Sequence, residues 1–280
     1  LKNGYIEASA KKLIGCEISF PGISVTGTEN IMMAAVLAKG QTILRNVAKE
    51  PEVEDLAKFL NSMGAQISGA GTDEITINGV DDLTESIFTI PADRIEAGTY
   101  LIAAAVTYGN ITIQDINANR MNNILDKLKL SGALIETNDN SIRLSMPNNS
   151  INSVDISTAP FPGFPTDMQA QFTVLNALSI GSAVVTENVF ENRFMHVQEL
   201  NRMGCDITVK GSNAFVKGVN RLTGAPVMAT DLRASASLIL AGLCADGETI
   251  VDRIYHIDRG YERIEEKLSY LGADITRLPG

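Results

Sequence analysis

Two sets of glycines recur at regular intervals, and they constrain the fold more than any other feature of the sequence. The first set ends strongly apolar stretches and the second ends more charged ones: Gly40, Gly109, Gly181 and Gly247, then Gly64, Gly132, Gly204 and Gly272. Within a pair the glycines lie 23 to 25 residues apart, and the second set recurs every 68 to 72 residues. This spacing indicates four copies of one supersecondary repeat.

Each repeat is predicted to run strand, helix, strand, helix, strand, strand. In the third repeat, residues 167–180 are apolar over the length of a helix, residues 183–188 are β-branched, and residues 193–203 are amphipathic. Two stretches that alternate with period 2 follow, at 206–210 and 214–219. The fold class is therefore α/β, built of repeated βαβαββ units.

The first helix of each repeat is apolar almost all the way round, at 31–38, 100–106, 172–178 and 238–244. A helix without a polar face must be covered on all sides. The second helix, as at 261–271, has one apolar stripe and a charged face. We therefore expect the four first helices to be central, with the sheets and second helices around them.

Composition narrows the class of protein. The chain has 280 residues, 45% of them apolar, and a net charge of −10. An acidic chain lacks the basic face that neutralises phosphates, which argues against a nucleic-acid partner. The sequence has no run of 18 apolar residues and no charged-then-apolar leader, so neither a membrane span nor export is expected.

The cysteines and histidines favour a cytoplasmic protein without a metal. Cys16, Cys205 and Cys244 have no C-x-x-C spacing and are expected to be reduced, buried residues. His196 and His256 lie 60 residues apart without cysteine partners, so no metal site is expected.

The same Thr-Asp pair stands before two of the apolar helices, as Thr166-Asp167 and Thr230-Asp231. Both aspartates lie where a helix N-cap belongs, and capping is one interpretation of each. Service in a binding site is the other. The residues alone leave both open.

Arg193 and Arg259 are predicted at equivalent places, at the start of the second helix in the third and fourth repeats. A cation there opposes the helix dipole at a cost of roughly 0.3–1 kcal/mol. A bound anion would reverse that sign, because helix N–H groups and a guanidinium together hold phosphate or carboxylate. The alternative is a salt bridge to the neighbouring Glu191 or Asp258.

Ser24, Val25 and Thr26 are expected in the loop before the first apolar helix, where Gly27 permits a tight turn with free amides. Such a loop either binds an anionic ligand or is an ordinary connection between a strand and a helix.

Five stretches of the sequence resemble one enzyme family. They are SVTGTEN at 24–30, FPTDMQAQF at 164–172, FENRFMH at 190–196, ATDLRASAS at 229–237 and HIDRGYE at 256–262. In this order they are similar to the UDP-N-acetylglucosamine enolpyruvyl transferases, over the whole of the 280 residues. These enzymes open peptidoglycan synthesis.

The resemblance implies a two-domain, inside-out α/β barrel of six units, of which this chain carries four. Residues 1–84 are expected to be the remainder of the first domain and residues 85–280 the second. The chain begins without Met and reaches an expected strand at 5–9, as in the carboxyl-terminal two-thirds of a longer protein. The family's amino-terminal third, with its Lys-Asn pair, two arginines and loop cysteine, is then absent, and the chain alone should be inactive.

The resemblance also implies the chemistry, which is transfer of the enolpyruvyl group of phosphoenolpyruvate to the sugar 3-hydroxyl with release of phosphate. No cofactor is implied. Asp167 and Arg259 would be catalytic. The residues implied for UDP-N-acetylglucosamine are Gly22, Ile23, Ser24, Val25, Thr26, Asp167 and Val189, and those for phosphoenolpyruvate or phosphate are Arg193, Asp231, Arg233 and Arg259.

Three alternatives remain at the level of the sequence. The shikimate-pathway enolpyruvyl transferase shares the fold and the phosphoenolpyruvate chemistry but takes a small phosphorylated ring. A second alternative is a non-catalytic fragment that binds only the nucleotide sugar. The third is an RNA-binding repeat module, which the acidity of the chain disfavours.

Overall fold

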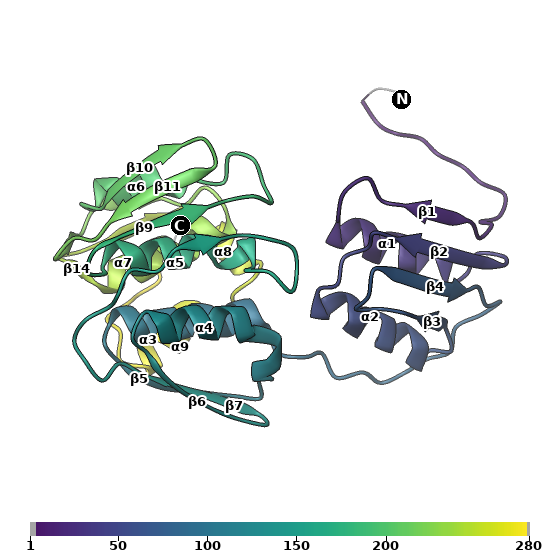
Figure 1. Cartoon of the computed structure of the whole chain (residues 1–280), viewed down its shortest axis with the longest axis horizontal. Helices are drawn as coiled ribbons and strands as arrows, with labels where there is room; N and C mark the ends of the chain where they lie inside the picture. The colour runs from purple at the N-terminus through teal and green to yellow at the C-terminus, as the bar shows by residue number, and fades with distance from the viewer. Residues whose placement is uncertain (1–3, 279–280) are drawn as a thin grey trace. The chain divides into compact units, whose positions relative to one another are not determined.

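The computed structural model of the chain describes residues 4–278. They form two compact units, of which the first runs to Pro91 and includes Pro160–Pro162, while the second holds Ala92–Ala159 and the residues from Gly163 onward. Figure 1 labels most of the elements of each unit. The assignment of residues 1–84 and 85–280 to two domains of the family stays a prediction.

The first compact unit is a four-stranded sheet with two helices. The strand order is β1-β2-β4-β3, with β1 parallel to β2 and the other pairs antiparallel. The elements are β1 (Glu17–Ser19), α1 (Val25–Ala35), β2 (Gln41–Arg45), α2 (Pro51–Ser62), β3 (Gln66–Ser68) and β4 (Glu74–Asn78). Leu44, Ile75 and Ile77 of the sheet and Met32 of α1 are fully buried in its core.

Helix α1 departs from the prediction that the first helices are covered on all sides. Only Thr28, Met32 and Ala35 of this helix are buried. Met33 is 47% exposed, and Leu37 just beyond the helix is 54% exposed. The reason is that the described part of this unit supplies one sheet and one further helix, which together cover a single face of α1.

The second compact unit contains the other three repeats. Its helices and 3₁₀ turns are α3 (Arg94–Val106), η1 (Ala118–Met121), α4 (Asn122–Leu130), η2 (Thr166–Met168), α5 (Gln169–Ala177), α6 (His196–Arg202), α7 (Leu232–Leu243), α8 (Tyr255–Asp258) and α9 (Ile264–Tyr270). Its strands are β5 (Asn110–Gln114), β6 (Leu134–Asn138), β7 (Ser141–Ser145), β8 (Ile156–Ser157), β9 (Ser182–Thr186), β10 (Asp206–Lys210), β11 (Asn213–Lys217), β12 (Leu222–Thr223), β13 (Pro226–Met228), β14 (Ala245–Asp246) and β15 (Ile250–Asp252).

The strands of this unit form small separate sheets. One has the antiparallel order β5-β7-β6, and another has the order β10-β11-β9-β8 with β8 parallel to β9. The last repeat contributes two short parallel pairs, β12-β14 and β13-β15. Each larger sheet presents one face to the helices, which matches the period-2 pattern of the sequence.

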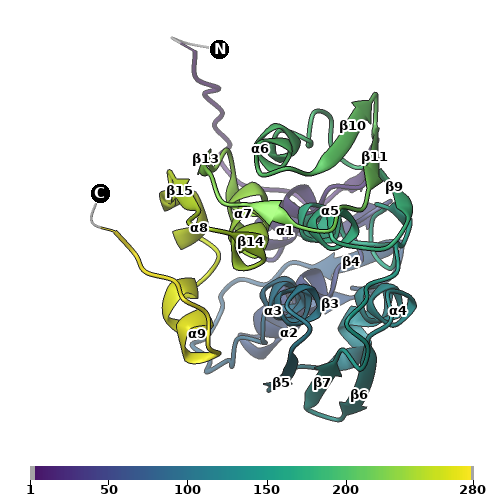
Figure 2. The same ribbon diagram turned by 90° about the vertical axis from the view of Figure 1, so that its left-hand side faces the viewer.

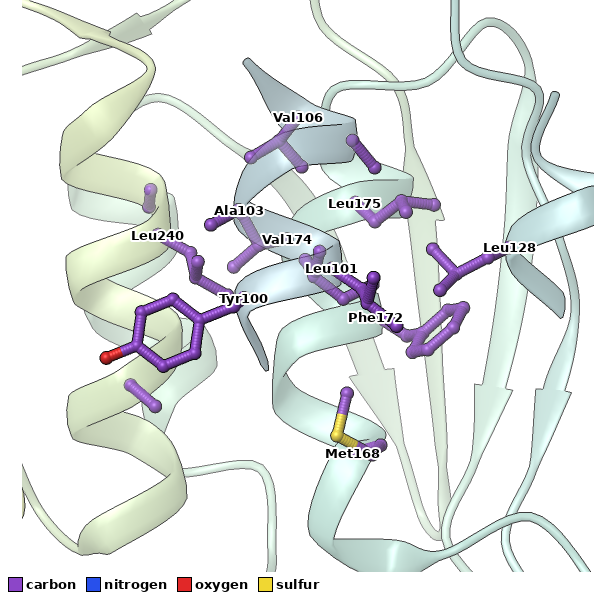
Figure 3. Close-up of a cluster of buried hydrophobic side chains, with 14 of the residues drawn as sticks. Tyr100, Leu101, Ala103, Val106, Leu128, Met168, Phe172, Val174, Leu175 and Leu240 are labelled. Atoms are coloured by element: carbon purple, nitrogen blue, oxygen red, sulfur yellow. The ribbon is translucent and has the colours of Figure 1, made fainter. Parts of the chain in front are cut away.

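Helices α3, α5 and α7 pack against one another in the interior of the second unit, and Figure 2 shows the sheets outside them. Leu101 of α3, Phe172 of α5 and Leu240 of α7 are at most 1% exposed, and Figure 3 shows this cluster of side chains. A covered apolar helix with a sheet outside it is the arrangement that the all-round apolar pattern predicts. The expected inside-out α/β fold is therefore confirmed.

The repeat is also visible in the backbone. Gly64, Gly132, Gly204 and Gly272 each come two residues after α2, α4, α6 and α9, and all four have φ between 96° and 106°. Glycine adopts this left-handed conformation without a steric penalty and so ends each of the four helices.

Several element boundaries differ from the prediction. The apolar helix of the third repeat begins at Gln169, after a separate 3₁₀ turn, and the amphipathic helix begins at His196 instead of residue 193. Helix α9 begins at Ile264, because Arg263 has a φ of 46° that breaks the helical run. Residues 5–9 form no strand beyond a single bridge position at Tyr5. Within residues 4–278, every helix is too short or too polar to traverse a lipid bilayer.

Candidate functional site

The carboxylate of Asp167 lies between two arginines in the second compact unit. Its Oδ1 accepts a hydrogen bond from Arg193 Nη2 at 2.9 Å and another from Arg233 Nε at 3.2 Å. Asp167 lies in η2, Arg193 in the loop before α6, and Arg233 in the first turn of α7. Three of the residues that the sequence singled out therefore meet at one carboxylate oxygen, which we call the Asp167 cluster.

The cluster is charged and partly shielded from water. The side chain of Asp167 is 39% exposed, against 23% for Arg193 and 15% for Arg233. Burial raises the pKa of Asp167, but the charges of Arg233 and Arg193 and their hydrogen bonds outweigh it, and the net pKa lies below the ordinary value. At neutral pH the cluster is a carboxylate with two guanidinium groups, so its net charge attracts anions.

Arg193 makes none of the contacts expected from its position in the sequence. Its Nη1 donates to Thr166 Oγ1 at 2.6 Å, and its guanidinium lies 4.7 Å from the centroid of the Phe190 ring. The salt bridge to Glu191 was one interpretation, and it is wrong because the side chain turns towards η2. Arg193 also precedes α6 by three residues, so the dipole argument does not apply to it.

Arg233 is held from two sides. Its Nε contacts Asp167, and its Nη1 donates to the hydroxyl of Tyr261 at 3.2 Å. Tyr261 is 1% exposed, and its hydroxyl also lies 2.8 Å from Thr99 Oγ1 on α3. Arg233 Nη2 has no hydrogen-bond partner within residues 4–278 and remains available for an anion.

Sequence reasoning missed the roles of Tyr261 and Thr99. Tyr261 was interpreted as part of the apolar stripe of a second helix, and its burial is consistent with that pattern. The hydroxyl was the signal that could have corrected this interpretation, because a buried tyrosine oxygen needs a hydrogen-bond partner.

The two Thr-Asp pairs have different roles. Asp231 is the N-cap of α7, and its Oδ1 accepts from the backbone N–H groups of Arg233 and Ala234, both at 2.9 Å. Asp167 caps no helix, since Met168 occupies the N-cap position of α5 and Pro165 that of η2. The capping interpretation is therefore right for Asp231 and wrong for Asp167.

Arg259 lies apart from the hydrogen bonds of the Asp167 cluster. It is exposed and forms the C-cap of the short helix α8, so the prediction that it starts a helix is wrong. The break between α8 and α9 is the reason. Asp258 is paired with Arg277, at 2.7 Å, and not with Arg259. Within residues 4–278, the side chain of Arg259 has no hydrogen bond or ion pair, and its backbone N–H donates to the carbonyl of Ile257.

Ser24 begins α1 in the first compact unit. Its side-chain oxygen accepts from the N–H of Gly27 at 3.1 Å, and Val25 and Thr26 are the first two residues of the helix. The expected loop at 24–26 is therefore a capped helix start, and the amide of Gly27 is bonded instead of free. Gly22 and Ile23 precede the cap and are exposed.

Val189 follows β9 and is held by a residue that sequence reasoning missed. Its backbone N–H donates to Glu187 Oε1 at 2.9 Å. Glu187 is only 3% exposed. An acidic residue in a strand end carries no sequence signal of burial, and its environment is visible only in the structure. Because the N–H of Val189 is occupied, its carbonyl is the backbone group left for a ligand.

Cysteines and metal-ligand residues contribute little to this region. Burial raises the pKa of the Cys205 and Cys244 thiols to about 12, which makes them poor nucleophiles. Cys16 was expected to be buried but is exposed, because it precedes β1 at the edge of its sheet. Within residues 4–278, no group of three or more His, Cys, Asp and Glu side chains is placed to hold a metal ion.

Comparison with known proteins gives consistent matches. Residues 1–268 match the family described as EPSP synthase (3-phosphoshikimate 1-carboxyvinyltransferase). The chain is 60% identical over 277 residues to the UDP-N-acetylglucosamine 1-carboxyvinyltransferase of Hydrogenovibrio crunogenus, covering 99% of this chain and 66% of that protein. It is 59% identical over 279 residues to the protein of the same name from Coxiella burnetii, covering 99% of this chain and 64% of that protein. The chain thus spans just under two thirds of these relatives.

Solved structures show the same fold. The enolpyruvyl transferase NikO from Streptomyces tendae has a TM-score of 0.87 and 25% identity, over 96% of this chain and 66% of that one. EPSP synthase from Acinetobacter baumannii has a TM-score of 0.73 and 18% identity, over 95% of this chain and 64% of that one. The family match over nearly all of the chain, together with these folds, shows that the chain belongs to the EPSP synthase (3-phosphoshikimate 1-carboxyvinyltransferase) family.

Proposed function

We propose that this chain forms part of a UDP-N-acetylglucosamine enolpyruvyl transferase, which moves the enolpyruvyl group of phosphoenolpyruvate to the sugar 3-hydroxyl and releases phosphate. The observation that carries the proposal is the Asp167 cluster, in which one carboxylate oxygen is held by Arg193 and Arg233. A reaction between a hydroxyl and an anionic phosphate ester needs an acceptor for the hydroxyl proton and cations for the anion, side by side.

The identity of the acceptor rests on the relatives. Proteins about 60% identical to this chain carry the name UDP-N-acetylglucosamine 1-carboxyvinyltransferase, whereas the EPSP synthases are 17–18% identical. This favours the nucleotide sugar over a small phosphorylated ring. The product would enter peptidoglycan synthesis, and the cytoplasmic location expected from the sequence stays a prediction.

Asp167 would orient the 3-hydroxyl and accept its proton late. Its pKa lies below the ordinary value, so the carboxylate is ionised but is a weak base. The proton therefore moves to Asp167 only as the sugar oxygen bonds to C2 of phosphoenolpyruvate while C3 takes up a proton. C3 then loses a proton as the C2–O bond to phosphate breaks, which restores the enolpyruvyl double bond and releases phosphate. The arginines would stabilise the anion throughout, because they are preorganised by Asp167 and Tyr261.

We propose the following roles for the remaining expected site residues. Arg233 Nη2 would bind the phosphate or carboxylate of phosphoenolpyruvate, and exposed Arg259 would close on the same anion. Asp231 would act through the cap that fixes the first turn of α7, where Arg233 begins. Val189 would accept a hydrogen bond from the sugar through its carbonyl. The residues Gly22, Ile23, Ser24, Val25 and Thr26 would hold the nucleotide.

The test uses a chimera in which this chain replaces the matching 277-residue region of the Hydrogenovibrio crunogenus relative. The chimera should release phosphate from phosphoenolpyruvate when UDP-N-acetylglucosamine is the acceptor. It should not do so with shikimate 3-phosphate, which serves as the control acceptor. Turnover with shikimate 3-phosphate alone, or a folded chimera that does not bind UDP-N-acetylglucosamine, would overturn the proposal.

A further inference from the structure

Glu187 is a buried carboxylate that receives four hydrogen bonds. Its Oε1 accepts from Thr158 Oγ1 at 2.9 Å, from the N–H of Val189 at 2.9 Å and from the N–H of Phe190 at 3.1 Å. Its Oε2 accepts from Thr166 Oγ1 at 2.8 Å. The residue is 3% exposed, and within residues 4–278 no ion pair joins it to a cation.

Burial of an unpaired carboxylate is unfavourable unless several donors replace its lost water. Here two hydroxyl groups and two backbone N–H groups do so, and hydrogen bonds to an ionised acceptor are stronger than neutral ones. A polar residue that only filled this space would not need four converging donors. The arrangement therefore fixes the segments that supply them.

One of these segments is the turn that contains Val189. The N–H of Asn188 donates to Thr158 Oγ1 at 2.9 Å, and the next two N–H groups donate to Glu187. Three successive amides are thus bonded within the protein. The direction of the Val189 carbonyl follows from this, because that carbonyl shares its peptide plane with the Phe190 N–H, which Glu187 holds, and in a trans peptide it points the opposite way.

The other segment is Thr166, next to Asp167. The hydroxyl hydrogen of Thr166 points to Glu187, so its oxygen is free to accept the bond from Arg193 Nη1 at 2.6 Å. Arg193 in turn donates through Nη2 to Asp167 at 2.9 Å. Because the carboxylate of Glu187 can only accept, Thr166 must donate to it and accept from Arg193. The chain of hydrogen bonds therefore runs from Glu187 through Thr166 and Arg193 to Asp167.

We infer that Glu187 is a positioning residue for the sugar side of the site. One carboxylate holds the Val189 turn and the Thr166–Arg193–Asp167 chain in a single geometry, so that the carbonyl of Val189 and the carboxylate of Asp167 meet the same sugar. This inference rests on the proposed function, since it assumes that a sugar hydroxyl is the group received there.

The first experiment replaces Glu187 in the chimera with Gln, which keeps the shape and removes the charge. The amide nitrogen would face Thr166 as a donor and compete with Arg193 for its oxygen. We expect KM for UDP-N-acetylglucosamine to rise by at least about tenfold and kcat to fall, because misplaced groups lose rate steeply. KM for phosphoenolpyruvate should rise by less than KM for the sugar, since Arg193 is disturbed but Arg233 keeps both of its contacts.

Two further variants separate positioning from stability. Asn176→Ala is the matched structural control. Asn176 is fully buried on α5 and makes two hydrogen bonds of 2.9 Å with the backbone of Val154, and none with the Asp167 cluster. This variant should lower Tm without changing the ratio of the two KM values. Thr166→Val removes only the hydroxyl and should lower kcat/KM for the sugar by about tenfold, like Glu187→Gln. The double variant should also lose about tenfold in kcat/KM instead of about a hundredfold, because both changes break the same chain of hydrogen bonds.

The outcomes distinguish this inference from the proposed function. If Glu187→Gln raises both KM values equally, or behaves like Asn176→Ala, Glu187 is only structural and the inference is overturned. Additive losses in the double variant overturn it as well, and Thr166→Val keeps the test available if the Gln variant does not fold. If the unmutated chimera fails to bind UDP-N-acetylglucosamine, the proposed function fails instead.

Discussion

Thr166-Asp167 precedes α5 and Thr230-Asp231 precedes α7, so the same dipeptide stands before two interior helices. Before α7 the aspartate is the N-cap, and its Oδ1 is occupied by two backbone N–H groups. Before α5 a 3₁₀ turn comes between the aspartate and the helix, and the carboxylate binds two guanidinium groups instead. Asp93 caps α3 in the same way as Asp231 caps α7. The carboxylate that is not needed for capping is the one that we propose for the chemistry.

The largest expected effect is on catalysis and contrasts Asp167 with a true cap. Asp167→Asn in the chimera should lower kcat by at least about 10², the lower range for a positioned acid or base. Asp93→Asn is the matched control, because Asn caps a helix about as well as Asp, and kcat should stay within about threefold. Steady-state phosphate release measures both. Equal losses at the two positions would remove Asp167 from the reaction.

A pH experiment at His196 sharpens the comparison, because this buried side chain is influenced both by Arg193 of the Asp167 cluster and by the cap residue Asp231. Burial lowers its pKa to about 4, with Arg193 lowering it further and Asp231 opposing. The unfolded chain protonates His196 near pH 6.5, whereas the folded chain does so only near pH 4. The free energy of unfolding is therefore at its full value above pH 6.5, and part of it is lost as the pH falls from 6.5 towards 4. The free energy of unfolding of the chimera should drop by about 2 kcal/mol between pH 7 and pH 5 from this group.

The measurement is the difference between variants in urea unfolding at pH 7 and pH 5. His196→Gln should remove the His196 share of the drop, whereas His256→Gln, at a partly exposed position, should retain it. A drop of the same size in the His196→Gln variant would mean that this imidazole is not kept neutral by its surroundings.

Arg259 extends the comparison to an arginine that no carboxylate within residues 4–278 holds. Arg259→Lys keeps the charge but loses the planar fork, so kcat/KM of the chimera should fall by more than about tenfold. Arg277→Lys is the control, because Arg277 lies in the same repeat and contacts Asp258 and Glu265. Its kcat/KM should stay within about twofold. An unchanged rate for Arg259→Lys would make Arg259 a surface residue without a ligand.

The smallest effect tests the caps by stability alone. Asp231→Ala should lower the free energy of unfolding by about 1 kcal/mol and Asp231→Asn should leave it nearly unchanged, because Asn replaces the capping oxygen. At Asp167 neither variant should lose a helix cap, since within residues 4–278 no helix N–H group donates to that side chain, and a difference between Asn and Ala would report the hydrogen bonds from Arg193 and Arg233. Thermal unfolding of the four variants measures this, and equal losses for Asp231→Asn and Asp231→Ala would mean that Asp231 does not stabilise α7 as a cap.

The sequence by itself determined the repeat and the class of fold. Glycine spacing and two apolar periods depend on local chemistry, and they located α3, α5 and α7 as interior helices and Gly64 and its counterparts as helix ends. The Thr-Asp pair singled out Asp167 and the expected helix start singled out Arg193, whereas Arg233 was implied only by the resemblance of its motif to the enzyme family. Local chemistry could not predict how far α1 is buried. Its apolar residues form a pattern like that of α3, but Met33 and Leu37 are exposed in this unit.

Only the tertiary structure decided which partner each charged group has. Arg193 contacts Asp167, 26 residues away, and not Glu191 beside it, and Arg233 contacts Asp167 across 66 residues while its neighbour Asp231 binds backbone. A hydrogen bond depends on distances of about 3 Å between groups that the packing of separate helices brings together. The same holds for Glu187, whose burial follows from the elements packed around it, and for the hydroxyl of Tyr261, whose partners Thr99 and Arg233 lie on α3 and α7.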